Sequence, residues 1–224
     1  MNAVLAAHAI KREVSTTSGP LTILDGVSLE VKPGESVAIQ GRSGSGKSTL
    51  LGTLAGLDLP QQGWIKIEGN DITELDEDQR AQLRANKIGF VFQSFYLIDD
   101  LSALENVALP LELFGRKNAT QVAADWLARL GLGDRTDHLP RQLSGGEQQR
   151  VALCRAFAVE PTVLFADEPT ANLDTGTAET VLDQLFSLQR EHNTSMVIAT
   201  HDHALAQRCD RVFQLQSGRL VSGE

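Results

Sequence analysis

A glycine-rich segment between an apolar strand and an apolar helix constrains the fold of this chain more than any other feature. Residues 41–49, GRSGSGKST, satisfy the pattern G-x-x-x-x-G-K-[ST]; they follow SVAIQ and lead into LLGTLAGL. Glycines let backbone N–H groups curl around a phosphate, and the dipole of the following helix adds to the attraction. The segment therefore predicts a strand–loop–helix unit that binds a nucleotide. The expected contacts are Gly41, Arg42, Ser43, Gly44, Ser45, Gly46, Lys47, Ser48 and Thr49.

Polar side chains in the loop itself and at the end of a later strand suggest which chemistry the loop supports. We expect Lys47 to reach the β- and γ-phosphates and the Ser48 hydroxyl to bind Mg²⁺. Asp167 and Glu168 end the hydrophobic strand TVLFAD, and ligands bind at the carboxyl ends of strands in open α/β sheets. Both carboxylates should therefore face the loop. Asp167 suits a Mg²⁺ contact through water, and Glu168 suits a general base that polarises the attacking water.

These residues predict a Mg²⁺-dependent ATPase- or GTPase-like protein. The chain has no N-K-x-D motif after the phosphate loop, which favours ATP over GTP. A nucleotide or small-molecule kinase with the same loop is an alternative, but it would need an acceptor pocket and a lid.

The order of apolar segments predicts an α/β fold. The 224 residues, 42% of them hydrophobic, suffice for a proper core. Residues 21–31 predict an N-terminal antiparallel β layer, and buried strands are expected at 36–40, 88–93, 162–167 and 195–200, with a closing hairpin at 211–221. Strands that alternate with helices imply a mainly parallel sheet. We expect one domain over 1–224, with a helical subdomain inserted at about 94–161.

The charge and hydropathy of the chain limit which partners and which cellular compartment are expected. A net charge of −9 argues against a nucleic-acid binder held by phosphate neutralisation, so no nucleic-acid partner is expected. No apolar run approaches the roughly 20 residues of a membrane span, and AVLAAHAI lacks a basic leader and a clear cleavage site. Cys154 and Cys209 fit no metal spacing and are expected to be reduced thiols. We expect a soluble cytoplasmic protein that acts at a membrane only through a partner.

A second glycine pair, in LSGGEQQR at residues 143–150, is expected at the N-terminus of a helix. Backbone N–H groups at such an end attract anions. From these residues alone, an anion site and an ordinary helix start are equally consistent with the pattern.

Six motifs run along the chain: the phosphate loop, VFQ with Gln93, LSGGEQQR, VLFADE, NLD with Asp174 and ATHD with His201. In this order they resemble the ATP-binding subunits of ABC transporters, over essentially the whole chain. The resemblance implies a P-loop NTPase core that is RecA-like, with a helical subdomain that carries the signature LSGGEQQR.

The resemblance also implies why there are two glycine loops. In this family two subunits pair head to tail, and the signature loop of one caps the γ-phosphate held by the other. Ser144, Gly145 and Gly146 would therefore serve a nucleotide on a second copy of the chain, and Asp174 would cross the interface between the copies. A second helix N-terminus closes the open face of the nucleotide and excludes water.

Other roles carry over from the family position by position. Gln93 resembles the loop glutamine that touches Mg²⁺ or the water and relays the nucleotide state to the membrane partner. His201 resembles the switch histidine near the γ-phosphate. The implied catalytic residues are Glu168, His201 and Lys47. The implied Mg²⁺ contacts are Ser48, Gln93 and Asp167.

The adenine site departs from the family. Many members have an aromatic residue near the N-terminus that stacks on adenine, and Val14 stands there in this chain. No Phe, Tyr or Trp precedes Trp64, so we expect apolar packing to hold adenine, with weaker discrimination between bases.

The stretch FVFQSFYLIDDLSALENVALPLELFG resembles a narrower group, the lipoprotein-release and macrolide-efflux ATPases and their uncharacterised bacterial relatives. This implies an integral-membrane permease as partner and a peripheral place on the cytoplasmic face of the bacterial inner membrane. Phe95, Tyr96 and Leu97 lie where a permease helix docks in this family, and they are equally consistent with core packing. The alternative is a soluble ABC-type ATPase not engaged in transport. Such proteins usually carry two cassettes or a long coiled-coil insertion, and this sequence has neither.

Overall fold

The computed structural model describes residues 3–17 and 19–222. The chain divides into two units. The first contains Met1–Arg84, Phe165–Glu168 and Ser195–Glu224, and the second contains Ala85–Leu164 and Pro169–Thr194.

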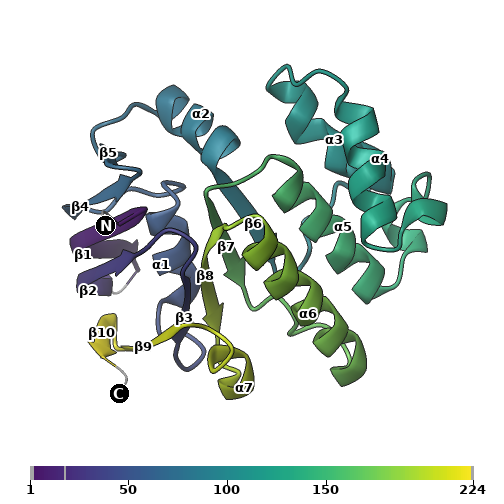
Figure 1. Cartoon of the computed structure of the whole chain (residues 1–224). Coiled ribbons are helices and arrows are strands. Elements are labelled where there is room, and N and C mark those ends of the chain that lie inside the picture. Colours follow the sequence, from purple (N-terminus) through teal and green to yellow (C-terminus); the bar gives the residue numbers. More distant parts are fainter. Residues whose placement is uncertain (1–2, 18, 223–224) are drawn as a thin grey trace. The chain divides into compact units, whose positions relative to one another are not determined.

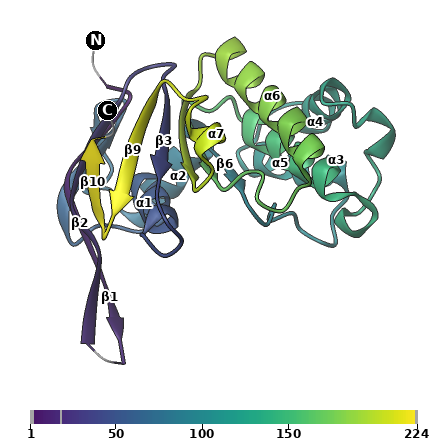
Figure 2. The ribbon, with the colours of Figure 1, turned by 90° about the horizontal axis from the view of Figure 1, so that it is seen from below.

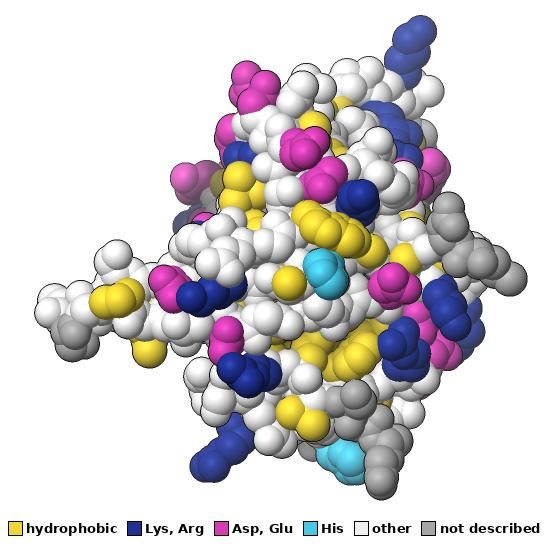
Figure 3. Space-filling view, turned by 90° about the vertical axis from the view of Figure 1, so that its left-hand side faces the viewer, with side chains coloured by type: hydrophobic (Ala, Val, Ile, Leu, Met, Phe, Trp, Pro, Cys, Tyr) yellow, Lys and Arg dark blue, Asp and Glu magenta, His cyan; other side chains and the backbone are white. Residues whose placement is uncertain are grey.

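An antiparallel sheet of the first unit has four strands in the order β2-β1-β4-β5. Their bounds are Leu5–Thr16 for β1, Gly19–Val31 for β2, Gln62–Ile67 for β4 and Asn70–Asp71 for β5. Along β2, Val27, Leu29 and Val31 are buried and alternate with exposed Ser28 and Glu30, as in a strand with one solvated face. The far ends of β1 and β2 form a hairpin arm that projects from this sheet (Figure 2). The arm carries both hydrophobic and charged side chains (Figure 3).

The second sheet of the first unit places β3 (Ser36–Gln40) between β8 (Ser195–Thr200) and β9 (Arg211–Gln216), both parallel to it. β7 (Val163–Asp167) lies beside β8, and β10 (Arg219–Ser222) forms an antiparallel hairpin with β9. The helices α1 (Lys47–Leu54) and α7 (His203–Ala206) both contact β8 (Figure 1). Because parallel strands end at one edge, the segments that follow β3, β7 and β8 share that edge.

The second unit is mainly helical and is built around α5 (Gly145–Ala158), whose Val151, Leu153 and Phe157 are buried. α5 contacts α3, α4, α6 and the strand β6 (Figure 1). The bounds are Ile88–Phe92 for β6, Ala103–Leu113 for α3, Ala119–Arg129 for α4, Thr175–Glu191 for α6, and Gly133–Arg135 and Pro140–Gln142 for the 3-10 turns η1 and η2. Just before β6, the Thr162 N–H donates to the Lys87 carbonyl oxygen (2.9 Å).

The α/β class predicted from the sequence is confirmed, and so are the strands at β3, β6, β7 and β8 and the closing hairpin. No strand occurs in residues 94–161, all of which the structure describes. α2 (Glu77–Lys87) is a polar surface helix with no buried residues. Cys154 and Cys209 are free thiols. No helix of the described residues has the length and apolarity to cross a bilayer.

Candidate functional site

The phosphate loop connects the end of β3 to the first turn of α1, and its glycines are required by backbone geometry. Gly44 and Gly46 have φ of 77° and 99°, a region that side chains rarely adopt. A Cβ on Gly41 would lie 2.6 Å from the Leu215 carbonyl oxygen. Ser48 and Thr49 continue into the first turn of α1, where backbone N–H groups have no partner within the helix.

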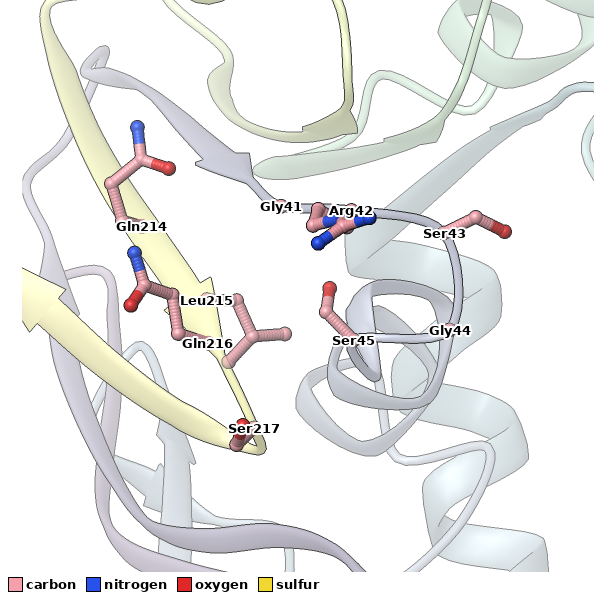
Figure 4. A pocket seen from close by; sticks show the side chains of 9 residues that line it. All are labelled: Gly41, Arg42, Ser43, Gly44, Ser45, Gln214, Leu215, Gln216 and Ser217. Atoms are coloured by element: carbon pink, nitrogen blue, oxygen red, sulfur yellow. The ribbon is translucent and has the colours of Figure 1, made fainter.

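A pocket of about 490 Å³ opens beside this loop. It is lined by residues 41–45 of the loop and by residues 214–217 at the end of β9. Leu215 points toward Ser45, whereas Ser43 points away from the pocket (Figure 4). The loop is therefore accessible to a ligand from the side of β9.

Lys47 is the first residue of α1, and its side chain turns back across the loop. Its Nζ donates to the carbonyl oxygens of Gly41 (2.9 Å) and Arg42 (3.3 Å). The same Nζ lies 3.5 Å from Oε1 of Glu168, and the two side chains are only 8% and 14% exposed. Little water screens these charges, so both can act strongly on a phosphate at the loop.

Glu168 follows β7 directly, in a left-handed conformation with φ of 45°. Its Oε1 lies 2.8 Å from Nδ1 of His201, and its Oε2 accepts from the Thr200 hydroxyl (3.2 Å). Left-handed backbone is unfavourable for Glu, and such strain concentrates at functional sites. A carboxylate oriented in this way can accept a proton from a bound water. Thr200 was not predicted from the sequence, where its only signal is its place at the end of a buried strand.

Asp167 lies at the end of β7, next to Ser48. Its Oδ1 is buried and has no hydrogen-bond partner within the described residues. Burial raises the pKa of the Asp167 carboxyl above its usual range, and a hydrogen bond from the Ser48 side chain opposes this. A buried carboxylate oxygen without a partner, beside a hydroxyl, is a donor set suited to Mg²⁺. Within the described residues no group of three or more His, Cys, Asp and Glu side chains could hold a metal ion by itself.

Gln93 follows β6 in the second unit and forms a reciprocal pair with Asn172. Gln93 Nε2 lies 3.3 Å from Asn172 Oδ1, and Asn172 Nδ2 donates to the Gln93 carbonyl oxygen (3.0 Å). The pair joins the segment after β6 to the segment before α6. Asn172 was not predicted from the sequence, although it stands two residues before Asp174 in NLD. The Mg²⁺ contact of Gln93 stays a prediction.

Ser144 begins α5 as its N-cap. Its hydroxyl donates to Oε2 of Glu147 (2.8 Å), and the Glu147 N–H donates back to that hydroxyl (3.3 Å). Hydrogen bonds from the Ser144 backbone N–H and hydroxyl lower the pKa of Glu147 to about 2. A Cβ on Gly146 would lie 2.3 Å from Cγ2 of Thr177, so a larger residue here would require the Thr177 side chain of α6 to move.

Asp174 caps α6 in the same unit. Its Oδ1 accepts from the Thr177 N–H (3.1 Å), and bonds to Thr177 lower the pKa of its carboxyl. Because Thr177 also lies against Gly146, the structure brings Ser144, Gly145, Gly146 and Asp174 together. In the first unit it brings the phosphate loop together with Asp167, Glu168 and His201. Val14 lies on the hairpin arm, opposite Leu21 of β2.

Comparison with known proteins places these features in a family. The family described as "ABC transporter" matches residues 24–171. The chain is 54% identical over 219 residues to the uncharacterized ABC transporter ATP-binding protein YbbA of Escherichia coli K12, covering 97% of this chain and 96% of that protein. It is 47% identical over 219 residues to the lipoprotein-releasing system ATP-binding protein LolD 2 of Caulobacter vibrioides, with 97% and 96% covered.

A solved structure is similar over nearly the whole chain. It is described as a dimeric, post-hydrolysis state of the ATP-binding cassette MJ0796 bound to ADP and Pi. It is 38% identical with a TM-score of 0.91, and the match covers 98% of this chain and 97% of that chain.

Proposed function

This chain belongs to the ABC transporter family, and from that premise we propose that it is the ATP-hydrolysing subunit of a membrane transport or mechanotransmission complex. The observation that carries the proposal is the Glu168 carboxylate, 3.5 Å from Lys47 Nζ and 2.8 Å from His201 Nδ1 beside the phosphate loop. A phosphate loop, a cation and an oriented carboxylate are the parts that hydrolysis of ATP needs.

In the proposed reaction the loop backbone holds the β- and γ-phosphates. Lys47 exchanges its bonds to the Gly41 and Arg42 carbonyls for phosphate oxygens and neutralises the charge that develops during transfer. A water attacks the γ-phosphorus, the bond to the ADP oxygen breaks, and Glu168 accepts the proton of the water. His201 holds the Glu168 carboxylate in place and lies near the γ-phosphate.

Asp167 and Ser48 are the residues that would hold Mg²⁺. The ion would draw charge from the phosphate oxygens and favour the in-line displacement. The buried Oδ1 of Asp167, which has no hydrogen-bond partner among the described residues, supports this assignment. A nucleotide bound at the loop would supply phosphate oxygens as further ligands of the ion.

The proposal includes a head-to-tail pair of copies. The N-terminus of α5, with Ser144, Gly145 and Gly146, caps the γ-phosphate on the other copy, and Asp174 lies at the interface. The position of these residues at the N-terminus of α5 supports this, because such an end presents N–H groups to an anion. The similar MJ0796 structure is dimeric, which agrees with the proposal.

A membrane partner completes the proposed complex. A groove of about 310 Å³ in the second unit is lined by Phe92, Tyr96, Pro110 and Arg155, among others, and Tyr96 is 65% exposed. We place a cytoplasmic segment of the permease there, with Phe95–Leu97 at its edge, and the chain on the cytoplasmic face of the inner membrane. An exposed aromatic residue over an apolar groove is typical of a protein contact.

The test is a pull-down of tagged Glu168→Gln protein from membranes of the source cell, with and without Mg·ATP. The expected result is an integral-membrane protein that co-purifies when ATP is present. Lys47→Ala protein is the matched control and should lose the dependence on ATP. Recovery of soluble protein or ribosomes alone would overturn the membrane assignment and favour a soluble ABC-type ATPase.

A further inference from the structure

Two consecutive aromatic residues after Gln93 have left-handed backbone. Phe95 and Tyr96 have φ of 60° and 47°. This conformation is unfavourable for bulky side chains and persists only where the surroundings impose it. Something in the second unit must therefore hold the Phe95–Tyr96 turn.

Arg155 of α5 holds both carbonyl oxygens of the turn. Its Nη2 donates to the Phe95 oxygen (2.8 Å) and its Nη1 to the Tyr96 oxygen (2.6 Å). These are short, charge-assisted bonds, and the planar fork of the guanidinium matches two adjacent acceptors. Burial lowers the pKa of the Arg155 guanidinium, which agrees with its enclosed position between the turn and the body of its own helix α5.

Neighbouring bonds make the segment rigid on both sides of the turn. Gln93 is held by Asn172 before it. After it, the buried Asn106 side chain accepts from the Ile98 N–H (2.8 Å) and donates to the Leu101 oxygen (2.9 Å). The turn is therefore the strained part of a segment whose two flanks are fixed by side chains from other elements.

The side chains of Phe95 and Tyr96 in this left-handed turn pack against different parts of the second unit. The Phe95 ring tip, Cζ, lies 3.8 Å from where a Cβ on Gly145 would stand, so it packs at the N-terminus of α5. The Tyr96 ring lies edge-on to Phe92, with 4.9 Å between ring centroids, and lines the groove.

We propose that Arg155 is a positioning residue for ATP hydrolysis: it imposes the left-handed Phe95–Tyr96 turn, which holds Phe95 against Gly145 and so sets the position of the signature end of α5. This assignment deepens the proposed function and rests on it, because it gives Ser144–Gly146 their role at the nucleotide of the other copy. It also connects the groove to that end of α5, since Tyr96 and Phe95 belong to one turn.

The test begins with Arg155→Lys, which keeps the charge but cannot bond two carbonyls as a fork. We expect kcat to fall by roughly tenfold, while the affinity of one subunit for a fluorescent ATP analogue stays within about twofold, because the phosphate loop is unchanged. In the Glu168→Gln background, ATP-dependent dimerisation should weaken by a similar factor.

A second substitution separates positioning from general damage to the fold. Asn tolerates left-handed backbone, so Tyr96→Asn should restore most of the lost kcat in the Arg155→Lys protein. The matched control is Glu160→Asn. It relieves the backbone strain at another left-handed residue (φ of 54°), one that Arg155 does not bond, and it should restore none of the lost kcat.

Each outcome decides the assignment. Unchanged kcat and dimerisation in Arg155→Lys would overturn it, and so would a loss that Tyr96→Asn and Glu160→Asn restore equally or not at all. If Glu168→Gln protein does not dimerise with ATP, the head-to-tail proposal fails instead, and the kcat rescue still decides the role of Arg155.

Discussion

One oxygen of Glu168 faces both His201 and Lys47: Oε1 lies 2.8 Å from Nδ1 of His201 and 3.5 Å from Nζ of Lys47. Glu168 is 14% exposed at its side chain, whereas His201 is 66% exposed. The carboxylate is thus enclosed between the phosphate loop and an accessible histidine. Of these two neighbours, His201 is the one open to solvent.

Glu168→Gln should bind ATP with little change and lose hydrolysis. The amide keeps hydrogen bonds to His201 and Thr200 but cannot accept a proton, so kcat should fall by about 10²-fold or more. Steady-state phosphate release and equilibrium nucleotide binding measure the two effects. Near-normal turnover would remove Glu168 from the role of base.

Asp167→Asn should make the nucleotide-free protein more stable and less responsive to Mg²⁺. Burial raises the pKa of Asp167, so the folded state holds this proton more tightly than the unfolded state. Stability from this group is present below its ordinary pKa and is lost as pH rises through the raised one. The variant should therefore unfold at a higher temperature than the wild type at pH 7, but not at acidic pH.

The exposed Asp125→Asn is the control for this comparison and should change neither property. Titration of Mg²⁺ against ATP binding provides the functional readout. Asp167→Asn protein that is no more stable at pH 7, and that keeps its full Mg²⁺ response, would contradict the assignment of Asp167.

Glu147→Gln should weaken the start of α5 at neutral pH. Bonds from Ser144 lower the pKa of Glu147 from its usual 4.5 to about 2, so this carboxylate stabilises the fold above pH 4.5. The stabilisation is lost as pH falls from 4.5 toward 2. A capping interaction contributes of order 1 kcal/mol. Urea unfolding should show this deficit at pH 7, and the deficit should shrink at pH 3; a deficit independent of pH would refute the explanation.

Val14→Tyr should tighten ATP binding and sharpen the choice of base. Val14 and Leu21 face each other across the hairpin arm and are 37% and 52% exposed, so the base site expected at Val14 would offer apolar surface but no ring. Stacking of a base on an aromatic ring contributes about 1–3 kcal/mol, or roughly 5- to 150-fold in affinity. Competition between ATP and GTP measures the effect. Thr16→Tyr, beyond Val14 on the arm, is the control, and equal gains in both variants would argue against a base site at Val14.

Local patterns made the core of the site predictable from the sequence. The phosphate loop is contiguous, and the carboxylates at Asp167 and Glu168 end a strand that is apolar throughout, so the rule for strand ends placed them beside Lys47. β1 was not predicted. Its sequence LAAHAIKREVST lacks regular alternation, because bulges near Ala9 and Arg12 shift its register against β2. Residues 5–16 form a strand because they pair with both β2 and β4, and this pairing is not visible in the local sequence pattern.

The left-handed backbone of the Phe95–Tyr96 turn could not be predicted from the neighbouring sequence, for a different reason. Nothing in FYL signals left-handed backbone, since aromatic residues disfavour it. The group that imposes it, Arg155, is 60 residues from Phe95 in the chain. The hydrogen-bonded pair of Gln93 and Asn172 could not be predicted for the same reason, because these residues are 79 positions apart in the chain.

The molar mass of Glu168→Gln protein in solution, with and without Mg·ATP, is the most direct test of the head-to-tail pair. Pairing around ATP predicts a monomer without nucleotide and a dimer with it. It also predicts that adding Ser144→Arg leaves ATP binding intact but keeps the protein monomeric, since the signature end of α5 acts on the other copy. A protein that stays monomeric with ATP, or a dimer that forms regardless of ATP and of Ser144, would contradict it.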